Sequence, residues 1–351
     1  MNFDINKIIR PNIKTLKPYS SARDEFSGEA SVYLDANENA FGSPLATNYH
    51  RYPDPMQYAV KMRLSAIKGV PARNIFLGNG SDEAIDILFR SFCNPGVDNV
   101  IIVPPTYGMY EVSANINDVA LKRVNLTADF QLDLDSIAEA IDVNTKLIFI
   151  CSPNNPTGNS IHREDIETLL ANFNGIIVVD EAYINFSRQK SFIQELTEYA
   201  NLVVLQTLSK AWGLAALRVG MAFASEEIIE VFNRVKPPYN INEASQQLAL
   251  EALQNVDQVN QWIKELLKER DALVLAIKDF DFVVDIYPSD ANFILVKTTN
   301  ADAIYKYLTQ VGIIVRNRNK VELCEGCLRI TVGTKEENEA LIDALKQFKE
   351  S

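Results

Sequence analysis

The sequence predicts an α/β fold, and two observations carry this prediction. Five short and almost wholly apolar runs recur between residues 75 and 225, and amphipathic segments separate them. Runs that are apolar at every position are typical of strands buried on both faces, as in a mostly parallel sheet covered by helices. The chain also has 351 residues, of which 47% are hydrophobic, and this is enough for a large core and about two domains.

The predicted strands and helices alternate along this part of the chain. The strands are "NVIIVP" at 99–104, "KLIFICSP" at 146–153, "GIIVVDEAY" at 175–183, "NLVVLQTLSK" at 201–210 and "RVGMAFA" at 218–224. Helices are predicted where apolar residues recur at helical spacing. These residues are Ile85, Leu88, Phe89 and Phe92, then Ile137 and Ile141, then Ile166, Leu169 and Leu170.

The pattern changes after about residue 255. A long charged helix is predicted at 258–280, and shorter strands follow at 291–297, 312–316 and 327–333 before a final helix. This order predicts a second, smaller α+β domain. We therefore divide the chain into an N-terminal segment, a large domain and a small domain, with limits 1–45, 46–255 and 256–351. The first segment is expected to pack with the small domain or across a dimer.

Composition excludes several classes of function. The formal net charge of −12 argues against a nucleic-acid or anionic membrane surface, so a small-molecule partner is expected. The N-terminus lacks an apolar signal region and no run reaches membrane-spanning length, which predicts a cytoplasmic protein. Four cysteines are too few for a disulfide scaffold, and a lone "CEGC" at 324–327 does not make a zinc site. With two histidines, no metal site is predicted.

Polar residues gather just after three of the predicted strands. They are "SPNNPTG" at 152–158, "DEAY" at 180–183 and "TLSK" at 207–210. In an open α/β sheet, functional residues lie at the carboxyl ends of the strands. Lys210 stands among small and apolar residues, as in "LSKAWGLAALRVG" at 208–220. This context predicts either a structural lysine whose charged end reaches solvent or a buried amine with a chemical role.

These residue types suit one kind of chemistry. A lysine amine can condense with an aldehyde, and an aspartate can keep a pyridine nitrogen protonated, so that the ring accepts electrons. Tyrosine and asparagine can bond the ring's phenolic oxygen, and an arginine beside helix N-terminal amides can hold a phosphate. The set therefore favours a pyridoxal phosphate site. The sequence "GNG" at 78–80 lacks the third glycine of a dinucleotide fingerprint.

Along nearly its whole length the chain resembles the fold type I pyridoxal phosphate aminotransferases of the histidinol-phosphate aminotransferase family. Eight motifs occur in the family's order: "LDANENAFG" at 34–42, "RYPDP" at 51–55, "GNGSDEAID" at 78–86, "PPTYGMY" at 104–110, "CSPNNPTG" at 151–158, "VVDEAY" at 178–183, "TLSKAWGLAALRVG" at 207–220 and "CLRITVG" at 327–333. The resemblance implies a mostly parallel seven-stranded sheet with helices on both faces.

The resemblance also implies roles for individual residues. Lys210 would bind pyridoxal 5'-phosphate covalently and then move the proton between the substrate α-carbon and the cofactor. Asp180 would pair with the pyridine nitrogen, Tyr183 and Asn155 with the phenolic oxygen, and Tyr107 would stack on the ring. The cofactor phosphate would be held by Arg218, Ser209, Thr207 and the backbone amides of Ser81 and Asp82. Tyr52 would reach the cofactor phosphate of a neighbouring subunit, which implies a homodimer with composite sites.

For the substrate, the resemblance implies a transaminase that interconverts L-histidinol phosphate and 2-oxoglutarate with imidazole acetol phosphate and L-glutamate. Arg329 and Arg316 would bind the substrate phosphate, with Tyr19 and Asn155 nearby. Because Arg316, Arg318 and Lys320 alternate along a strand, a solvated edge strand is the other interpretation. An aromatic amino acid aminotransferase, a threonine-phosphate decarboxylase and a non-catalytic, cofactor-binding regulatory module stay open as alternatives.

Overall fold

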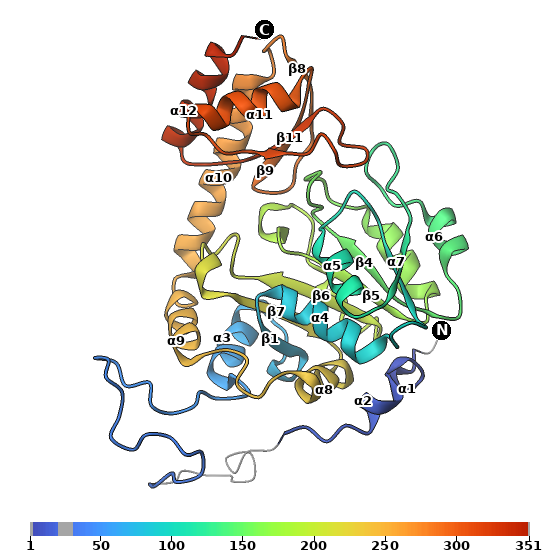
Figure 1. Ribbon diagram of the computed structural model, residues 1–351, viewed down its shortest axis with the longest axis vertical. Coiled ribbons are helices and arrows are strands. Elements are labelled where there is room, and N and C mark those ends of the chain that lie inside the picture. The colour runs from blue at the N-terminus through green and yellow to red at the C-terminus, as the bar shows by residue number, and fades with distance from the viewer. Residues whose placement is uncertain (1–2, 20–30, 350–351) are drawn as a thin grey trace.

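The protein is described by a computed structural model that covers residues 3–19 and 31–349. A large domain with a seven-stranded sheet lies below a small domain with a four-stranded sheet, and helix α10 (Val256–Ile277) runs from one to the other (Figure 1). Within the described ranges, no helix combines the length and apolar character that a membrane crossing needs.

The large sheet has the strand order β1-β7-β6-β5-β4-β2-β3. Its strands are β1 (Ile75–Asn79), β2 (Asn99–Ile102), β3 (Ala120–Arg123), β4 (Thr145–Cys151), β5 (Ile176–Asp180), β6 (Leu202–Thr207) and β7 (Val219–Ala224). β7 runs antiparallel to both of its neighbours, and the other pairs are parallel. The mostly parallel sheet is thus confirmed.

Helices cover both faces of this sheet, which explains the continuous apolar runs. Successive strand residues enter two separate cores: Leu147 and Phe149 pack on one face, and Ile148 and Ile150 on the other. The covering helices are α3 (Tyr58–Lys68), α4 (Ser81–Phe92), α5 (Met109–Ile116), α6 (Leu134–Ala140), α7 (Arg163–Asn172), α8 (Glu226–Val235) and α9 (Glu243–Ala252). Short 3-10 turns lie at Ala72–Asn74, Ile184–Phe186, Phe192–Glu195 and Ala215–Leu217.

The small sheet is antiparallel and has the order β10-β11-β9-β8. Its strands are β8 (Val283–Tyr287), β9 (Phe293–Thr298), β10 (Arg316–Asn317) and β11 (Cys327–Thr331), packed with α10, α11 (Ala301–Gln310) and α12 (Lys335–Gln347). The predicted strand at 312–316 is wrong except for its last residue, because Gly312 has a φ of +84° and the ladder begins only at Arg316.

The long helix α10 belongs to both domain cores. Val259 and Ile263 in its first half pack into the core of the large domain, whereas Leu273 and Ile277 in its second half pack into the core of the small domain. Apolar residues at helical spacing therefore bury one stripe of the same helix against two different sheets.

The start of the chain packs on the large domain. Helices α1 (Ile5–Ile8) and α2 (Pro11–Lys14) bury Ile8 and Ile13 against it. The backbone nitrogen of Arg10 donates to the Ser91 carbonyl at 3.0 Å, at the end of α4. Within the single chain, residues 3–14 therefore pack with the large domain and not with the small domain, and the alternative of packing across a dimer stays a prediction. Further along, most of the segment 31–52 extends away from both domains (Figure 1) and exposes Leu34 and Phe41, whereas its last residue, Tyr52, stacks on Tyr239 of the large domain.

Candidate active site

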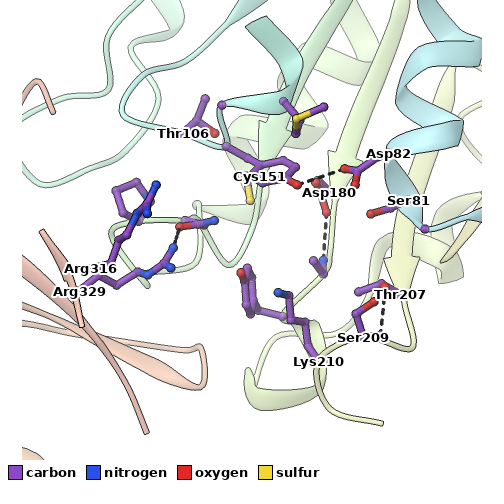
Figure 2. Close-up of a pocket in the computed structure, with 18 of the residues that line it drawn as sticks. Ser81, Asp82, Thr106, Cys151, Asp180, Thr207, Ser209, Lys210, Arg316 and Arg329 are labelled. Carbon is purple, nitrogen blue, oxygen red and sulfur yellow. Dashed lines mark hydrogen bonds between the residues drawn. The ribbon is translucent and has the colours of Figure 1, made fainter. Parts of the chain in front are cut away.

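A cavity of about 720 Å³ lies at the carboxyl ends of β4, β5 and β6, and the small domain contributes one wall. Figure 2 shows Lys210 and Asp180 reaching it from the large domain, whereas Arg316 and Arg329 reach it from strands of the small domain. Twelve of the fourteen residues singled out in the sequence line this cavity: Ser81, Asp82, Tyr107, Asn155, Asp180, Tyr183, Thr207, Ser209, Lys210, Arg218, Arg316 and Arg329. The topology therefore brings together motifs that are far apart in the chain.

Lys210 follows the end of β6, and its side chain faces the cavity. Of the two alternatives that its apolar neighbours predict, a fully buried amine is wrong: the side chain of Lys210 is exposed on the cavity side, while Leu208, Ala211 and Trp212 are buried around it. Its Nζ lies 5.7 Å from the centre of the Tyr183 ring. The cavity walls lower the pKa of Lys210 by removing water, and the nearby charge of Arg329 lowers it further. A lower pKa gives more free amine, which is the nucleophilic form.

Asp180 is the last residue of β5, and its carboxylate is buried with 3% exposure. Oδ2 accepts a hydrogen bond from the Tyr110 hydroxyl at 2.7 Å, and Oδ1 accepts one from the Ala182 backbone nitrogen at 3.1 Å. Burial nevertheless raises the pKa of Asp180 to about 6. A cationic group against this carboxylate would favour its ionised form, so the position suits a protonated ring nitrogen.

Tyr110 is a residue that sequence reasoning missed. Its ring is fully buried and stacks on Phe149 with centroids 4.8 Å apart, and its hydroxyl is directed to Asp180. It belongs to the motif "PPTYGMY", three residues after Tyr107, but only Tyr110 lies in α5, because this helix begins at Met109. The spacing of Tyr107 and Tyr110 does not indicate that only Tyr110 reaches Asp180.

Two other tyrosines face the cavity. Tyr183 is buried and packs edge-on against Phe293 with ring centroids 5.2 Å apart, and burial raises its pKa. The Tyr107 hydroxyl donates to Asp82 Oδ1 at 3.1 Å. Both phenols therefore stay protonated at neutral pH and can act as hydrogen-bond donors.

A cradle for a phosphate lies where α4 begins. Ser81 and Asp82 form the first turn of α4, whose free backbone amides attract anions. Arg218 faces them, and its Nη1 lies 3.5 Å from Ser209 Oγ. Thr207 Oγ1 accepts from the Ser209 backbone nitrogen at 3.0 Å and thereby fixes the turn that carries the serine hydroxyl.

Two glycines make this cradle possible. Gly80 has a φ of +77°, and a Cβ there would lie 2.6 Å from Arg218 Nη2. A Cβ on Gly220 of β7 would lie 2.1 Å from the Ser81 backbone nitrogen. Only residues without a side chain let the backbone and the guanidinium approach the start of α4 so closely.

The small domain supplies a second cluster of cations. Arg316 of β10 and Arg329 of β11 are opposite each other in the antiparallel register. Arg329 Nη1 donates to Asn155 Oδ1, which links the small domain to the loop after β4. No residue in the described ranges accepts a hydrogen bond from Asn155 Nδ2, so this amide nitrogen can donate into the cavity.

The remaining two predicted residues lie outside the cavity. Tyr19 is 71% exposed, and the other residues of its motif that follow, at 20–23, are outside the described ranges. Tyr52 is 50% exposed and stacks on Tyr239 with centroids 4.5 Å apart. The single chain therefore does not bring either tyrosine to Lys210, and their roles stay predictions.

A buried network supports the strand end that carries Asp180. The carboxylate of the next residue, Glu181, accepts from the Phe192 backbone nitrogen at 2.7 Å and from Gln206 Nε2 at 2.9 Å. Lys68 Nζ donates to Gln206 Oε1 at 2.7 Å. A buried carboxylate with several donors and a nearby cation is satisfied, so this group holds the backbone beside Asp180 in place.

A comparison with known families decides the classification. The family model described as aminotransferase class I and II matches residues 33–345. The chain belongs to the class I and II aminotransferases. Two curated relatives of this aminotransferase are named histidinol-phosphate aminotransferase. The protein of Cytophaga hutchinsonii is 54% identical over 348 residues, which cover 99% of this chain and 100% of the relative. The protein of Flavobacterium johnsoniae is 52% identical over 347 residues and 98% of each chain.

Solved structures show that the aminotransferase has the expected fold. Histidinol-phosphate aminotransferase from Sinorhizobium meliloti, in complex with pyridoxal-5'-phosphate, superimposes with a TM-score of 0.79 at 23% identity, covering 88% of each chain. L-threonine-O-3-phosphate decarboxylase from Porphyromonas gingivalis gives a TM-score of 0.73 at 23% identity, covering 85% of this chain and 91% of the other. Fold type I is therefore confirmed, while the neighbours include two different activities.

The residues of the aminotransferase fit pyridoxal phosphate. The cradle at α4 offers amides, a hydroxyl and a guanidinium to a phosphate, and a Cβ at Gly80 would close it. Asp180 offers a buried carboxylate to a pyridinium, and Lys210 an amine to an aldehyde. The donors thus match the three functional groups of the cofactor.

Proposed function

We propose that this chain is a histidinol-phosphate aminotransferase that uses pyridoxal 5'-phosphate and passes the amino group of L-glutamate to imidazole acetol phosphate. The observation that carries the proposal is the pairing of Arg316 with Arg329 in one wall of the cavity that contains Lys210 and Asp180. A phosphate monoester is a dianion, and two guanidiniums bind it better than they bind a single carboxylate. High identity to relatives of that name over the full chain supports it.

In this mechanism each side chain acts on one atom of the cofactor or of the substrate. The cofactor, when bound, supplies an electron sink for the charge left when the α-proton is removed. Asp180 would hold the proton on the ring nitrogen of the cofactor, and Tyr183 and Asn155 would donate hydrogen bonds to its phenolic oxygen. Lys210 takes the proton from the α-carbon as a general base and returns it as an acid, a role that its lowered pKa favours.

The arginines would serve both halves of the reaction. In one half they hold the phosphate of the amino alcohol, and in the other they hold the carboxylates of glutamate. Each substrate carries two negative charges, on one phosphate or on two carboxylates, so one cationic wall can accept either. This keeps the α-carbon near Lys210 in each case.

The test is a spectroscopic titration of the purified holoenzyme. L-histidinol phosphate, phenylalanine and threonine phosphate are added separately while the cofactor's visible absorption is recorded. A rapid change at micromolar histidinol phosphate, with much slower responses to the other two, is expected. A preferred response to phenylalanine would indicate an aromatic aminotransferase, and release of carbon dioxide from threonine phosphate would indicate the decarboxylase. A cofactor that absorbs but responds to no amino donor would indicate a regulatory module.

We also propose a homodimer with composite sites in the cytoplasm. The segment 31–52, which carries Tyr52, exposes Leu34 and Phe41 to solvent in the single chain, and a second copy would cover such apolar side chains. The four unpaired cysteines, all buried, fit a reducing compartment.

Subunit mixing tests the composite site. Lys210→Ala and Tyr52→Phe each inactivate both sites of a homodimer. In a mixed dimer with shared sites, one site carries both changes and the other carries none, so random mixing is expected to restore about a quarter of the sites. No recovery after mixing, with mixed dimers shown by mass spectrometry, would contradict shared sites.

A further inference from the structure

A third arginine faces the same wall of the cavity. The ladder of β10 continues for one residue, because the Arg318 backbone nitrogen donates to the Cys327 carbonyl at 2.9 Å. Side chains alternate along a strand, so Arg318 lies on the same face as Arg316, and Arg329 lies on that face of β11. All three line the cavity together with Lys210 and Tyr183.

The opposite face of this segment is anchored. Asn317 Nδ2 donates to Asp302 Oδ1 at 2.6 Å, and Asn319 Nδ2 donates to Asp302 Oδ2 at 2.9 Å, at the start of α11. Asn319 Oδ1 also accepts from the Gly326 backbone nitrogen at 2.8 Å. With both flanking residues held, the backbone keeps the Cβ of Arg318 on the cavity side of the segment as long as these bonds are intact.

No acid neutralises this group of arginines. Within the described ranges, Arg316, Arg318 and Arg329 form no ion pair, and the buried Nε atoms of Arg318 and Arg329 have no hydrogen-bond partner. Burial and, to a smaller extent, the charges of Arg329 and Arg316 lower the pKa of Arg318 to about 10. Three like charges on neighbouring strand positions repel one another, and a bound dianion would offset that repulsion.

We propose that Arg318 is a specificity-determining residue that donates to the substrate phosphate together with Arg316 and Arg329. The inference rests on the proposed function and deepens it. A phosphate monoester has three terminal oxygens and two charges, whereas a carboxylate has two oxygens and one charge. The third guanidinium therefore selects for the phosphorylated amino alcohol over amino acids that end in an uncharged ring.

The natural control lies two residues further along. Lys320 carries the same charge as Arg318, but the predicted alternation along a strand is wrong at this residue, because a turn closed by the Val321 nitrogen and the Arg318 carbonyl follows Arg318. Lys320 is exposed and does not line the cavity. Lys320→Gln therefore reports the loss of one positive charge near the site, and Arg318→Gln reports the loss of the donor in the site. Arg318→Lys keeps the charge but not the forked geometry.

The experiment measures the holoenzyme variants in two ways. For Arg318→Gln, kcat/KM with histidinol phosphate is expected to fall about tenfold to a hundredfold, mainly through KM, since a charged hydrogen bond is lost. Activity with histidinol, which lacks the phosphate, is expected to stay within twofold. Inorganic phosphate, titrated as a competitive inhibitor while the cofactor fills its own phosphate site, should bind at least fivefold more weakly. Compared with Arg318→Gln, Arg318→Lys should regain part of kcat/KM with histidinol phosphate and part of the affinity for inorganic phosphate. Lys320→Gln should change neither quantity.

Several outcomes would overturn the proposal. An equal loss with histidinol and histidinol phosphate would mean that Arg318 is structural, and a change below twofold with the phosphorylated substrate would mean that it makes no contact. A failure of the proposed function looks different: the wild-type holoenzyme would not turn over histidinol phosphate. In that case, weaker binding of inorganic phosphate, measured by calorimetry, to Arg318→Gln but not to Lys320→Gln would still support the anion site.

Discussion

Replacing Asp180 by Asn is expected to stabilise the apoprotein while it weakens cofactor binding. Burial raises the pKa of Asp180 from 3.8 to about 6, so the folded protein binds this proton more tightly than the unfolded chain does. The ionised carboxylate therefore costs the native state free energy above pH 3.8, and the cost reaches its full value above about pH 6. A difference of about 2 pH units corresponds to about 3 kcal/mol.

Asparagine avoids this cost and fits the same contacts. Its oxygen can accept from the Ala182 backbone nitrogen, and its amide can donate to the Tyr110 oxygen. The gain in the free energy of unfolding is expected to be about 3 kcal/mol at pH 8 and about 1.5 kcal/mol at pH 5, because the wild-type carboxylate is then mostly protonated in the folded state. Cofactor affinity should fall at least tenfold, since the ring nitrogen loses its anionic partner.

The assay is urea unfolding of the cofactor-free protein at both pH values, at one protein concentration. Asp279→Asn, at an exposed position, is the control for the loss of one negative charge. An Asp180→Asn protein that is no more stable than wild type at pH 8, or that gains the same amount at pH 8 and pH 5, would refute the reasoning from burial.

Two further changes probe the contacts around this residue. Tyr110→Phe removes the hydroxyl that donates to Asp180 at 2.7 Å and should raise the pKa of the carboxyl further, so that cofactor affinity at pH 7 falls about tenfold; a fluorescence titration that shows unchanged affinity would argue against this. Gly220→Ala places a methyl group 2.1 Å from the Ser81 backbone nitrogen and should cost about 2–3 kcal/mol of unfolding free energy and weaken cofactor binding. Gly108→Ala, which meets nothing within 4 Å, is the control in the same urea assay, and equal stability of the two variants would show that the cradle can widen.

The fold was predictable where burial alone sets the pattern. β4, β5 and β6 are apolar at nearly every position because helices cover both faces, and the sequence located them. β3 was missed because it is a four-residue strand at the sheet edge with half-exposed side chains. The antiparallel direction of β7 was not predictable either, because its fully apolar run is the same in either direction.

The part of the candidate site that is built from residues directly after strands was predictable. Asp180, Lys210 and the loop of Asn155 follow strand ends, so their meeting at one edge follows from the topology. The Tyr110 contact with Asp180 joins residues 70 apart in the chain and depends on the tilt of α5. The burial of Arg318 depends on how the small domain sits over the large one. Neither the Tyr110 contact nor the burial of Arg318 can be inferred from the spacing of residues in the sequence.

The continuous helix α10 makes the geometry of the cavity sensitive to distant packing. It has 22 residues and is about 33 Å long, and its two ends are seated in different cores. A tilt of about 5° at Val259 would displace the far end of the helix by about 2 Å, because about 27 Å of helix lies between them. The arginines of β10 and β11 belong to the small domain, at the far end of α10, whereas Lys210 belongs to the large domain. A substitution in the lower half of α10 can therefore misalign a bound phosphate with the reacting amine without touching either of them.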